Sequence, residues 1–365
     1  MWPRTRLTEL LGIAHPIVQG PFGGGLSTVQ LAAAVSNAGG LGSFGAHHLG
    51  GAEILDVASA IRRETSAPFA LNLWVPTGTE PSPQAVAERF ARDVERLAPY
   101  YEAMGLPLPT LPERFGPAYE EQLEAVYQAR PPVFSFIFGV PDASVLAECR
   151  RRGITTIGTA TNVAEARALA AAGVDAIAAS GTEAGGHRAS FLRPPEESPA
   201  SAALVPQVAD AVACPVIAAG GIADGRGVAA ALALGADGVQ VGTAFLACAE
   251  SAATEAHRAA IRSDAAYATV LTRAFSGRLA RGIRNRMMSE LEPFQAELPP
   301  YPVQNWLTGP VRRAAAKANR GEFLALWAGQ NAPLVKHETA RALMAFLVED
   351  TEKQLTRLAA LVPKR

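Results

Sequence analysis

The chain has 365 residues, of which 49% are hydrophobic and 18% are charged, and this composition excludes a disordered chain and a coiled coil. Lysine and arginine total 33 against 34 aspartates and glutamates, so the net charge of −1 creates no field that would attract nucleic acid or an anionic membrane. We therefore expect a small molecule as the partner, and the length fits one α/β barrel with an appendage as well as two equal domains.

Short apolar segments that read as strands alternate with alanine-rich helical segments through the first 250 residues. The expected strands are residues 16–19, 41–44, 69–73, 133–136, 155–157, 176–179, 216–218 and 238–241. The expected helices include residues 28–37, 52–62, 143–151, 163–172, 202–211 and 225–234. Several of these helices are followed by a glycine that fits a C-terminal cap, at Gly39, Gly153, Gly173 and Gly235. Eight such units predict an α/β protein with a closed (β/α)₈ barrel, a TIM barrel, over residues 1–250.

Two segments do not follow this repeat. Residues 76–132 contain two charged helical runs, at 83–96 and 119–129, and we expect this insertion to form a lid over the third strand. Residues 263–365 are rich in arginine at first, then broken by proline, and then helical from 337 to 361. We expect them to form a mostly helical C-terminal appendage that packs on the barrel.

The N-terminus lacks the apolar run of a secretory signal, and no stretch of about 18 uncharged apolar residues is present. The cysteines Cys149, Cys214 and Cys248 are widely spaced and form no CxxC motif, which argues against disulfides and a zinc site. We therefore expect a soluble cytoplasmic protein, either a monomer or a homodimer.

In a (β/α)₈ barrel the active site lies at the carboxyl ends of the strands, and phosphate is bound after the last two strands. Gly220 and Gly221 follow the seventh expected strand, and Gly242 and Thr243 follow the eighth. Backbone N–H groups at two helix N-termini are thus predicted to converge on one phosphate. The alternative is that these glycines only make tight turns.

A second glycine-rich loop, residues 20–25, follows the first strand, where a backbone without side chains would let a flat ring approach. A hinge is an equal alternative for this loop. His187 lies in another loop, residues 180–188 after the sixth strand, and is our candidate general base, although a structural histidine is the alternative. His47 and His48 follow the second strand and are candidates for the same face or for packing, whereas His15, His257 and His337 are expected to be structural.

No metal-binding motif or serine–histidine–aspartate set is present. Five arginines cluster within fourteen residues, at Arg273, Arg278, Arg281, Arg284 and Arg286. We interpret them as salt-bridge partners that hold the appendage to the barrel, with capture of an anionic substrate as the alternative. Nucleic-acid binding is not expected.

Several motifs carry a resemblance to a known family. They are PIVQGPFGGG near the start, NLWVP at 72–76, SFIFG at 135–139, GTEAGGHR at 181–188, VIAAGGIADG at 216–225, VQVGT at 239–243, RAFSG at 273–277 and LWAGQ at 326–330. Over nearly its whole length the chain resembles the class I nitronate monooxygenases, long called 2-nitropropane dioxygenases, which are FMN-dependent (β/α)₈ enzymes. The resemblance implies His187 as the catalytic base. It implies FMN contacts at Gly20, Phe22, Gly23, Asn72, Ser180, Gly185, Gly220, Gly221, Gln240, Val241, Gly242 and Thr243.

The implied reaction is the oxidation of an alkyl nitronate, such as propionate 3-nitronate, by O₂ to a carbonyl compound and nitrite, with a nitroalkane as the neutral substrate. The chain departs from the family pattern at four places: Ser180 replaces a glutamine, Phe22 a methionine, the His47–His48 pair a Gly-Tyr pair, and Ala189 a glycine. These departures put substrate choice in doubt more than FMN binding. Three alternatives stay open: an FMN-dependent NAD(P)H reductase of quinones or enoyl thioesters, a flavin-free isomerase or lyase acting on a sugar phosphate, and a flavin-binding protein without turnover.

Overall fold

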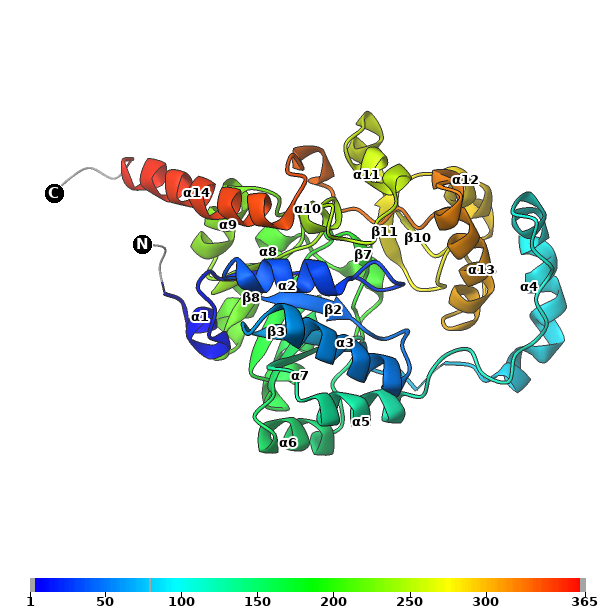
Figure 1. The fold of residues 1–365 in the computed structure, drawn as a ribbon, viewed down its shortest axis with the longest axis horizontal. Coiled ribbons are helices and arrows are strands. Elements are labelled where there is room, and N and C mark those ends of the chain that lie inside the picture. The colour runs from blue at the N-terminus through cyan, green and yellow to red at the C-terminus, as the bar shows by residue number, and fades with distance from the viewer. Residues whose placement is uncertain (1–3, 79, 362–365) are drawn as a thin grey trace.

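The computed structural model describes residues 4–78 and 80–361, and its centre is a barrel of eight parallel strands (Figure 1). The strands are β1 (Ile17–Gln19), β2 (Gly42–Gly45), β3 (Phe69–Trp74), β4 (Val133–Ile137), β5 (Thr155–Ala160), β6 (Ala176–Ser180), β8 (Val216–Ala219) and β9 (Gly238–Val241). Their order is β1-β9-β8-β6-β5-β4-β3-β2, and a parallel bridge between Val18 and Leu41 joins the two ends. The predicted TIM barrel is confirmed, and all eight expected strands are present.

Helices cover the outside of the barrel and follow the strands in the expected order. Those between strands are α2 (Val29–Asn37), α3 (Gly51–Glu64), α5 (Tyr119–Ala129), α6 (Ala143–Arg151), α7 (Val163–Ala171), α8 (Ser201–Ala211) and α9 (Gly225–Ala233). The short α1 (Arg6–Leu11) precedes β1, and the short α10 (Thr243–Leu246) follows β9. Gly39, Gly153, Gly173 and Gly235 all have positive φ, between 70° and 97°, as expected for residues that end helices.

Close packing of helix on sheet explains one glycine in particular. A Cβ on Gly42 of β2 would lie 1.9 Å from the carbonyl oxygen of Ala32 in α2, so only glycine lets this helix approach the strand. The strands are buried on both faces, because their side chains fill either the barrel interior or the layer beneath the helices.

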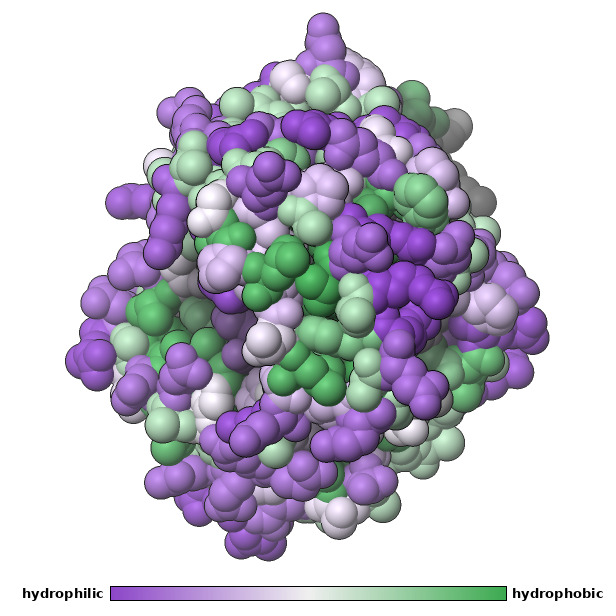
Figure 2. Space-filling view, turned by 90° about the vertical axis from the view of Figure 1, so that its right-hand side faces the viewer, coloured by the Kyte–Doolittle hydropathy of each residue, from purple (hydrophilic) through white to green (hydrophobic). Residues whose placement is uncertain are grey.

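The insertion between β3 and β4 contains two helices with different neighbours. α5 is the crossover helix between these strands and packs on α3, whereas α4 (Pro83–Ala103) packs on α13 (Val303–Lys317) at one edge of the molecule (Figure 1). Phe115, in the segment of the chain that joins α4 to α5, lines the cavity described below. On the face of the molecule where α4 and α13 lie, apolar side chains gather near the middle and hydrophilic ones surround them (Figure 2).

The C-terminal part is mostly helical, as expected, but it also forms a small sheet that the sequence did not predict. β10 (Thr269–Thr272) pairs with β11 (Ala280–Ile283), and β11 pairs with β7 (Gly186–His187), which belongs to the loop after β6. The helices of this part are α11 (Glu255–Ile261), α12 (Arg286–Leu291), α13 and α14 (Ala340–Ala359). α14 lies along α9 and α2 (Figure 1). In the described ranges, none of the helices has the length and apolarity needed to cross a bilayer.

Candidate active site

A cavity of about 770 Å³ opens at the carboxyl ends of the barrel strands, within the range of ~300–1,000 Å³ that is common for ligand sites. Most residues of the implied FMN set line it: Gly20, Phe22, Gly23, Asn72, Ser180, Gly185, Gly220, Gly221, Gln240, Gly242 and Thr243. Val241 differs, because its side chain is fully buried in the barrel core. Its carbonyl oxygen instead accepts a hydrogen bond from the Gly20 N–H at 2.8 Å, which fixes the start of the glycine-rich loop.

Uncharged polar side chains line the cavity where the strands end. Asn72 ends β3 and donates to the Ser135 hydroxyl of β4 at 3.0 Å. Thr159, Ser180 and Gln240 also line the cavity, and their side chains make no hydrogen bond with any described residue. Unpaired hydroxyl and amide groups in a partly buried wall suit a ligand with several hydrogen-bonding atoms.

The glycine-rich loop after β1 is held rigidly against the second strand. The Ser27 hydroxyl accepts hydrogen bonds from the N–H groups of Phe22 and Gly45, and it donates to the Phe22 carbonyl. A Cβ on Gly23 would lie 2.3 Å from Cε1 of His47. Glycine is therefore required here for His47 to pack, and the backbone of residues 20–25 forms one wall of the cavity.

His187 lies in β7, where it pairs with Ala280 of β11, so the small sheet positions the candidate base. Its Nε2 is 2.8 Å from the Ser276 hydroxyl oxygen. Burial lowers the pKa of His187 to about 3, with further lowering by the nearby cations of Arg278, Arg312 and Arg188. The imidazole is therefore neutral at physiological pH, which is the state required of a proton acceptor.

The hydrogen bonds around Ser276 indicate which nitrogen of His187 is free. The Ser276 hydroxyl has one hydrogen and can donate it to the carbonyl oxygen of Arg278, 3.2 Å away. Because a carbonyl oxygen can only accept, the hydroxyl uses its hydrogen for the bond to Arg278. The hydroxyl oxygen must then accept the hydrogen bond from His187, so Nε2 is the nitrogen that carries the proton. Nδ1 is then the nitrogen with a free lone pair.

Aromatic rings form the wall beside His187. The Trp74 ring lies edge-on to it at 4.9 Å between centroids, and the Trp327 ring at 5.3 Å. His47 stacks on Trp74, with 3.8 Å between the ring centroids and the two rings nearly parallel. Burial lowers the pKa of His47 well below its usual value, so His47 is neutral as well. His257, expected to be structural, lines the cavity and donates to the carbonyl of Trp327 at 3.0 Å.

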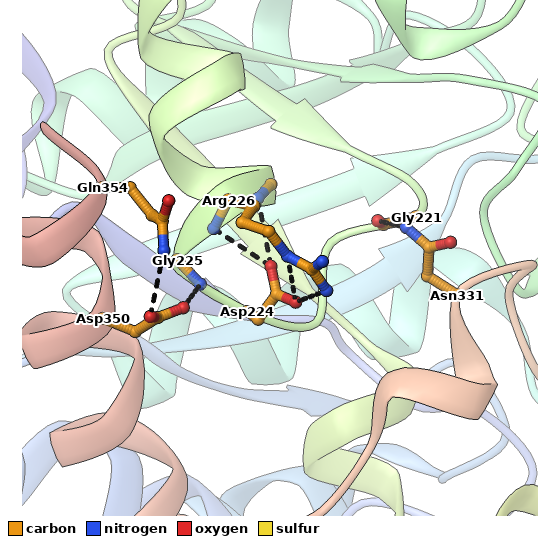
Figure 3. Close-up of polar contacts among 8 residues, drawn as sticks. Gly221, Asp224, Gly225, Arg226, Asn331, Asp350 and Gln354 are labelled. Atoms are coloured by element: carbon orange, nitrogen blue, oxygen red, sulfur yellow. Dashed lines mark hydrogen bonds and ion pairs between the residues drawn. The ribbon is translucent and has the colours of Figure 1, made fainter. Parts of the chain in front are cut away.

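Residues 328–331 of the C-terminal part close one side of the rim. The Gly329 N–H donates to the Thr243 hydroxyl at 2.9 Å, and the Gln330 N–H donates to the Glu183 carbonyl at 3.0 Å. The Asn331 side chain donates to the Gly221 carbonyl (Figure 3). These bonds join the loops after β6, β8 and β9 into one rim.

The structure corrects one expectation about phosphate binding. The first N–H groups of α9 are not free, because Asp224 accepts from Arg226 and Gly227 and Asp350 of α14 accepts from Gly225 at 2.8 Å (Figure 3). The prediction that two helix N-termini converge on one phosphate is therefore wrong for α9. Among the described residues, the backbone N–H groups of Gly221 and Gly242 still have no protein acceptor, and both residues line the cavity.

The five arginines of the cluster divide into three groups by their partners. Arg273 pairs with Glu196 of the barrel, and Arg281 donates to the Thr182 carbonyl at 2.9 Å, which fits the interpretation that arginines hold the appendage. Arg278 pairs with Glu80 of the insertion at 2.9 Å and lies 3.9 Å from the centroid of the Phe138 ring. The remaining two, Arg284 and Arg286, pair within the appendage with Glu292 and Glu290.

Sequence reasoning did not assign a chemical role to several residues around His187. Trp74, Ser276 and Trp327 belong to motifs that carried the family resemblance, namely NLWVP, RAFSG and LWAGQ. Their positions within these motifs were the signal by which the sequence could have indicated them. Arg312 also lines the cavity, but it lies in an alanine-rich helical segment without any motif.

Comparisons with known proteins agree with this geometry. Residues 4–350 match the family model described as nitronate monooxygenase. A protein of Staphylococcus aureus (strain MRSA252) named "probable nitronate monooxygenase" is 41% identical over 350 residues, which cover 95% of this chain and 97% of that protein. The structure of nitroalkane oxidase from Streptomyces ansochromogenes is similar with a TM-score of 0.87 and 38% identity, over 97% of this chain and 100% of that one. FabK from Thermotoga maritima is similar with a TM-score of 0.77 and 29% identity, over 99% of this chain and 100% of that one.

Proposed function

This chain belongs to the nitronate monooxygenase family, and from that premise we propose that it binds FMN and oxidises alkyl nitronates with O₂ to a carbonyl compound and nitrite. The observation that carries the proposal is that one cavity combines a neutral, buried histidine with a polar wall and unpaired backbone donors. Membership of the family makes the protein an oxidoreductase. The parts of the proposal that need a test are that the cofactor is FMN and that the substrate is an alkyl nitronate.

The residues present fit FMN. The free N–H groups of Gly221 and Gly242 are suitable donors for its phosphate, and the side chains of Asn72, Ser180 and Gln240 are suitable partners for the edge of its ring. A methyl group at Gly242 would meet no atom within 4 Å, so the space beside this backbone is open. When bound, FMN supplies the acceptor that takes electrons from the substrate.

The protein's own residues orient the substrate and control its protonation. A nitronate is already an anion, so it needs no base, and the aromatic wall and the glycine-rich loop restrict its position. A neutral nitroalkane must first lose its α-proton, and Nδ1 of His187 is the available acceptor. Ser276 holds the ring through Nε2 and thereby keeps Nδ1 unprotonated.

The test begins with the absorption spectrum of the purified protein, followed by addition of propionate 3-nitronate in air and measurement of nitrite. We expect a flavin spectrum and nitrite formation. A colourless protein that cannot be reconstituted with FMN, or a flavoprotein that forms no nitrite, would contradict the proposal. Rapid bleaching of the flavin by NADPH without oxygen would instead favour the reductase.

The variant His187→Asn tests the base. It should retain FMN and lose turnover of a neutral nitroalkane more than turnover of the nitronate, because only the first reaction needs proton removal. Equal nitroalkane activity in the variant and the parent protein would exclude His187 as the base.

A further inference from the structure

An ion pair joins the insertion to the turn that carries Ser276. Arg278 donates from a terminal nitrogen to Glu80 at 2.9 Å, and the two residues are 198 positions apart in the chain. The side chains of Arg278 and Glu80 are only 15% and 21% exposed, so solvent screens the pair little. Among the described residues, Glu80 is the one hydrogen-bond acceptor of this guanidinium, whose Nε is buried without a partner. Arg278 therefore depends on Glu80 for compensation of its charge.

Both partners of the pair are held in place by their own surroundings. The Glu80 carboxylate accepts hydrogen bonds from the N–H and the hydroxyl of Thr77, at 2.8 and 2.9 Å, shortly after β3 ends. The Arg278 guanidinium lies over the rings of Phe138 and Tyr301, 3.9 and 4.6 Å from their centroids. The pair thus fixes the turn between β10 and β11 relative to the carboxyl end of β3.

The backbone of Arg278 in turn holds Ser276. Its N–H donates to the Ser276 hydroxyl oxygen at 3.2 Å, and its carbonyl oxygen accepts from the same hydroxyl at 3.2 Å. The second bond directs the hydroxyl hydrogen away from His187, whose Nε2 lies 2.8 Å from the hydroxyl oxygen. A continuous series of contacts therefore runs from Glu80 through Arg278 and Ser276 to the candidate base.

Glu80 and Arg278 do not touch the substrate themselves, because neither residue lines the cavity. We propose that this ion pair positions the candidate base: through it, the insertion keeps the hydroxyl hydrogen of Ser276 away from Nε2 of His187, so that Nδ1 stays free to accept a proton. Loss of the Glu80 charge would leave Arg278 buried without compensation, and the turn would have to shift to bring the guanidinium to water. The Ser276 hydroxyl could then donate to Nε2, and the proton of the ring would move to Nδ1.

Nitrogen-15 NMR of the FMN-loaded protein, labelled at its histidines, measures the tautomer without any substrate. In the parent protein we expect the signal of a protonated nitrogen from Nε2 of His187 and that of an unprotonated nitrogen from Nδ1, and His187→Asn identifies both signals by their loss. In Glu80→Gln the two signals should move toward each other, because both tautomers become populated. Glu80→Asp retains the carboxylate and should restore part of the difference. Arg278→Lys keeps the charge but loses the fork of donors, so it gives an independent test and should shift the signals as Glu80→Gln does.

Kinetics with nitroethane and its conjugate base, ethyl nitronate, test the consequence for the reaction. This part of the inference rests on the proposed function. In Glu80→Gln we expect kcat/KM for nitroethane to fall roughly 10- to 100-fold, because His187 loses both its free Nδ1 and its fixed position. The value for ethyl nitronate should change less than about 2-fold, since this substrate needs no base.

Glu297→Gln is the matched control, because Glu297 pairs with Arg96 of α4 and so also joins the C-terminal part to the insertion. Glu297 has no hydrogen bond to Ser276 or Arg278. The control variant should leave the histidine signals and both kcat/KM values unchanged.

The outcomes separate this inference from the proposed function. Histidine signals in Glu80→Gln that match those of the parent protein would overturn the inference. An equal fall in both kcat/KM values would also overturn it, because that result indicates a general loss of structure, and so would the same changes in Glu297→Gln. If the signals change as expected while the parent protein forms nitrite from neither substrate, the link to His187 stands and the proposed reaction fails.

Discussion

Adding one methyl group at Gly185 tests whether the rim of the cavity depends on the docking of residues 328–331. A Cβ at this position would lie 2.6 Å from the carbonyl carbon of Ala328 and 2.6 Å from the nitrogen of Gly329. Both contacts are with backbone, which no side-chain rotation can relieve. Gly185→Ala must therefore displace the loop from the His187 segment.

The expected cost follows from the contacts that the displacement breaks. The loop must retreat by ~0.8 Å to reach ordinary van der Waals distance, and overpacking of this kind costs about 1–3 kcal/mol. The same movement weakens the hydrogen bonds from Gly329 to Thr243 and from Gln330 to Glu183, each worth about 0.5–1.5 kcal/mol. We therefore expect the free energy of unfolding to fall by about 1–6 kcal/mol, with the upper limit reached if both hydrogen bonds are lost.

Urea unfolding of the purified variants measures this change, and the dissociation constant for FMN should rise with it because Thr243 belongs to the displaced rim. Gly116→Ala is the control, since a Cβ there meets no atom within 4 Å and the backbone is not in the left-handed region. If Gly185→Ala unfolds at the same urea concentration as Gly116→Ala, the steric reasoning is refuted.

Three further predictions concern single groups. Gly242→Ala should leave the stability of the apoprotein unchanged and weaken FMN binding at least ~10-fold, because its methyl group enters open space beside a proposed phosphate donor; a fluorescence titration with FMN measures this. Ser276→Ala removes the hydrogen bond that holds the proton of His187 on Nε2, so Nδ1 is no longer kept unprotonated. The variant should lower kcat/KM for a nitroalkane by up to the roughly 10²–10⁴-fold that a general base supplies, and nitronate turnover should be retained. Burial lowers the pKa of His257 to about 4 in the folded protein, whereas its ordinary pKa of 6.5 applies in the unfolded chain. Below pH 6.5 the unfolded chain therefore binds a proton at this histidine and the folded protein does not. The free energy of unfolding should therefore fall with pH by about 1.4 kcal/mol per unit from this group between pH 6.5 and about 4, and His257→Gln, which can still donate to Trp327, should remove that part of the slope in urea titrations.

The barrel could be predicted because its signals are local. Each strand is a short apolar segment, and the helices end at glycines such as Gly39 and Gly235, whose positive φ only glycine adopts at low cost. The location of the cavity followed from the same pattern, since the carboxyl ends of parallel strands meet at one side of a barrel. His187 could be placed there because its loop directly follows β6.

The partners of His187 could not be predicted, because they come from distant parts of the chain. β7 has two residues and no strand pattern of its own, and it exists because β11 pairs with it from almost a hundred residues away. Ser276 lies in the turn between β10 and β11, so its contact with His187 is a consequence of that sheet. Sequence periodicity carries no information about such pairings.

The wrong prediction of a free N-terminus for α9 has the same cause, a partner that lies far away in the chain. The glycines before this helix indicated a free N-terminus, but Asp224 caps it locally and Asp350 reaches it from α14, 125 residues later in the chain. A local cap was visible in the sequence, since aspartate is a favoured N-cap residue. The second carboxylate became evident only when the structure placed α14 along α9 (Figure 3).

The charges of the cavity bear on which of the two substrates of the proposed reaction suits it better. Burial lowers the pKa of His187 to about 3, and the nearby cations of Arg278, Arg312 and Arg188 contribute to that lowering. An imidazole with so low a pKa is a weak proton acceptor for a neutral nitroalkane. The same positive charge attracts an anion, and a nitronate arrives with its proton already removed. Once an anion is bound it offsets the arginines and raises the pKa of His187, so the histidine gains basicity only after a negative charge has entered. The positive charges that add to the effect of burial in weakening the base thus also favour binding of the nitronate, whose oxidation needs no base.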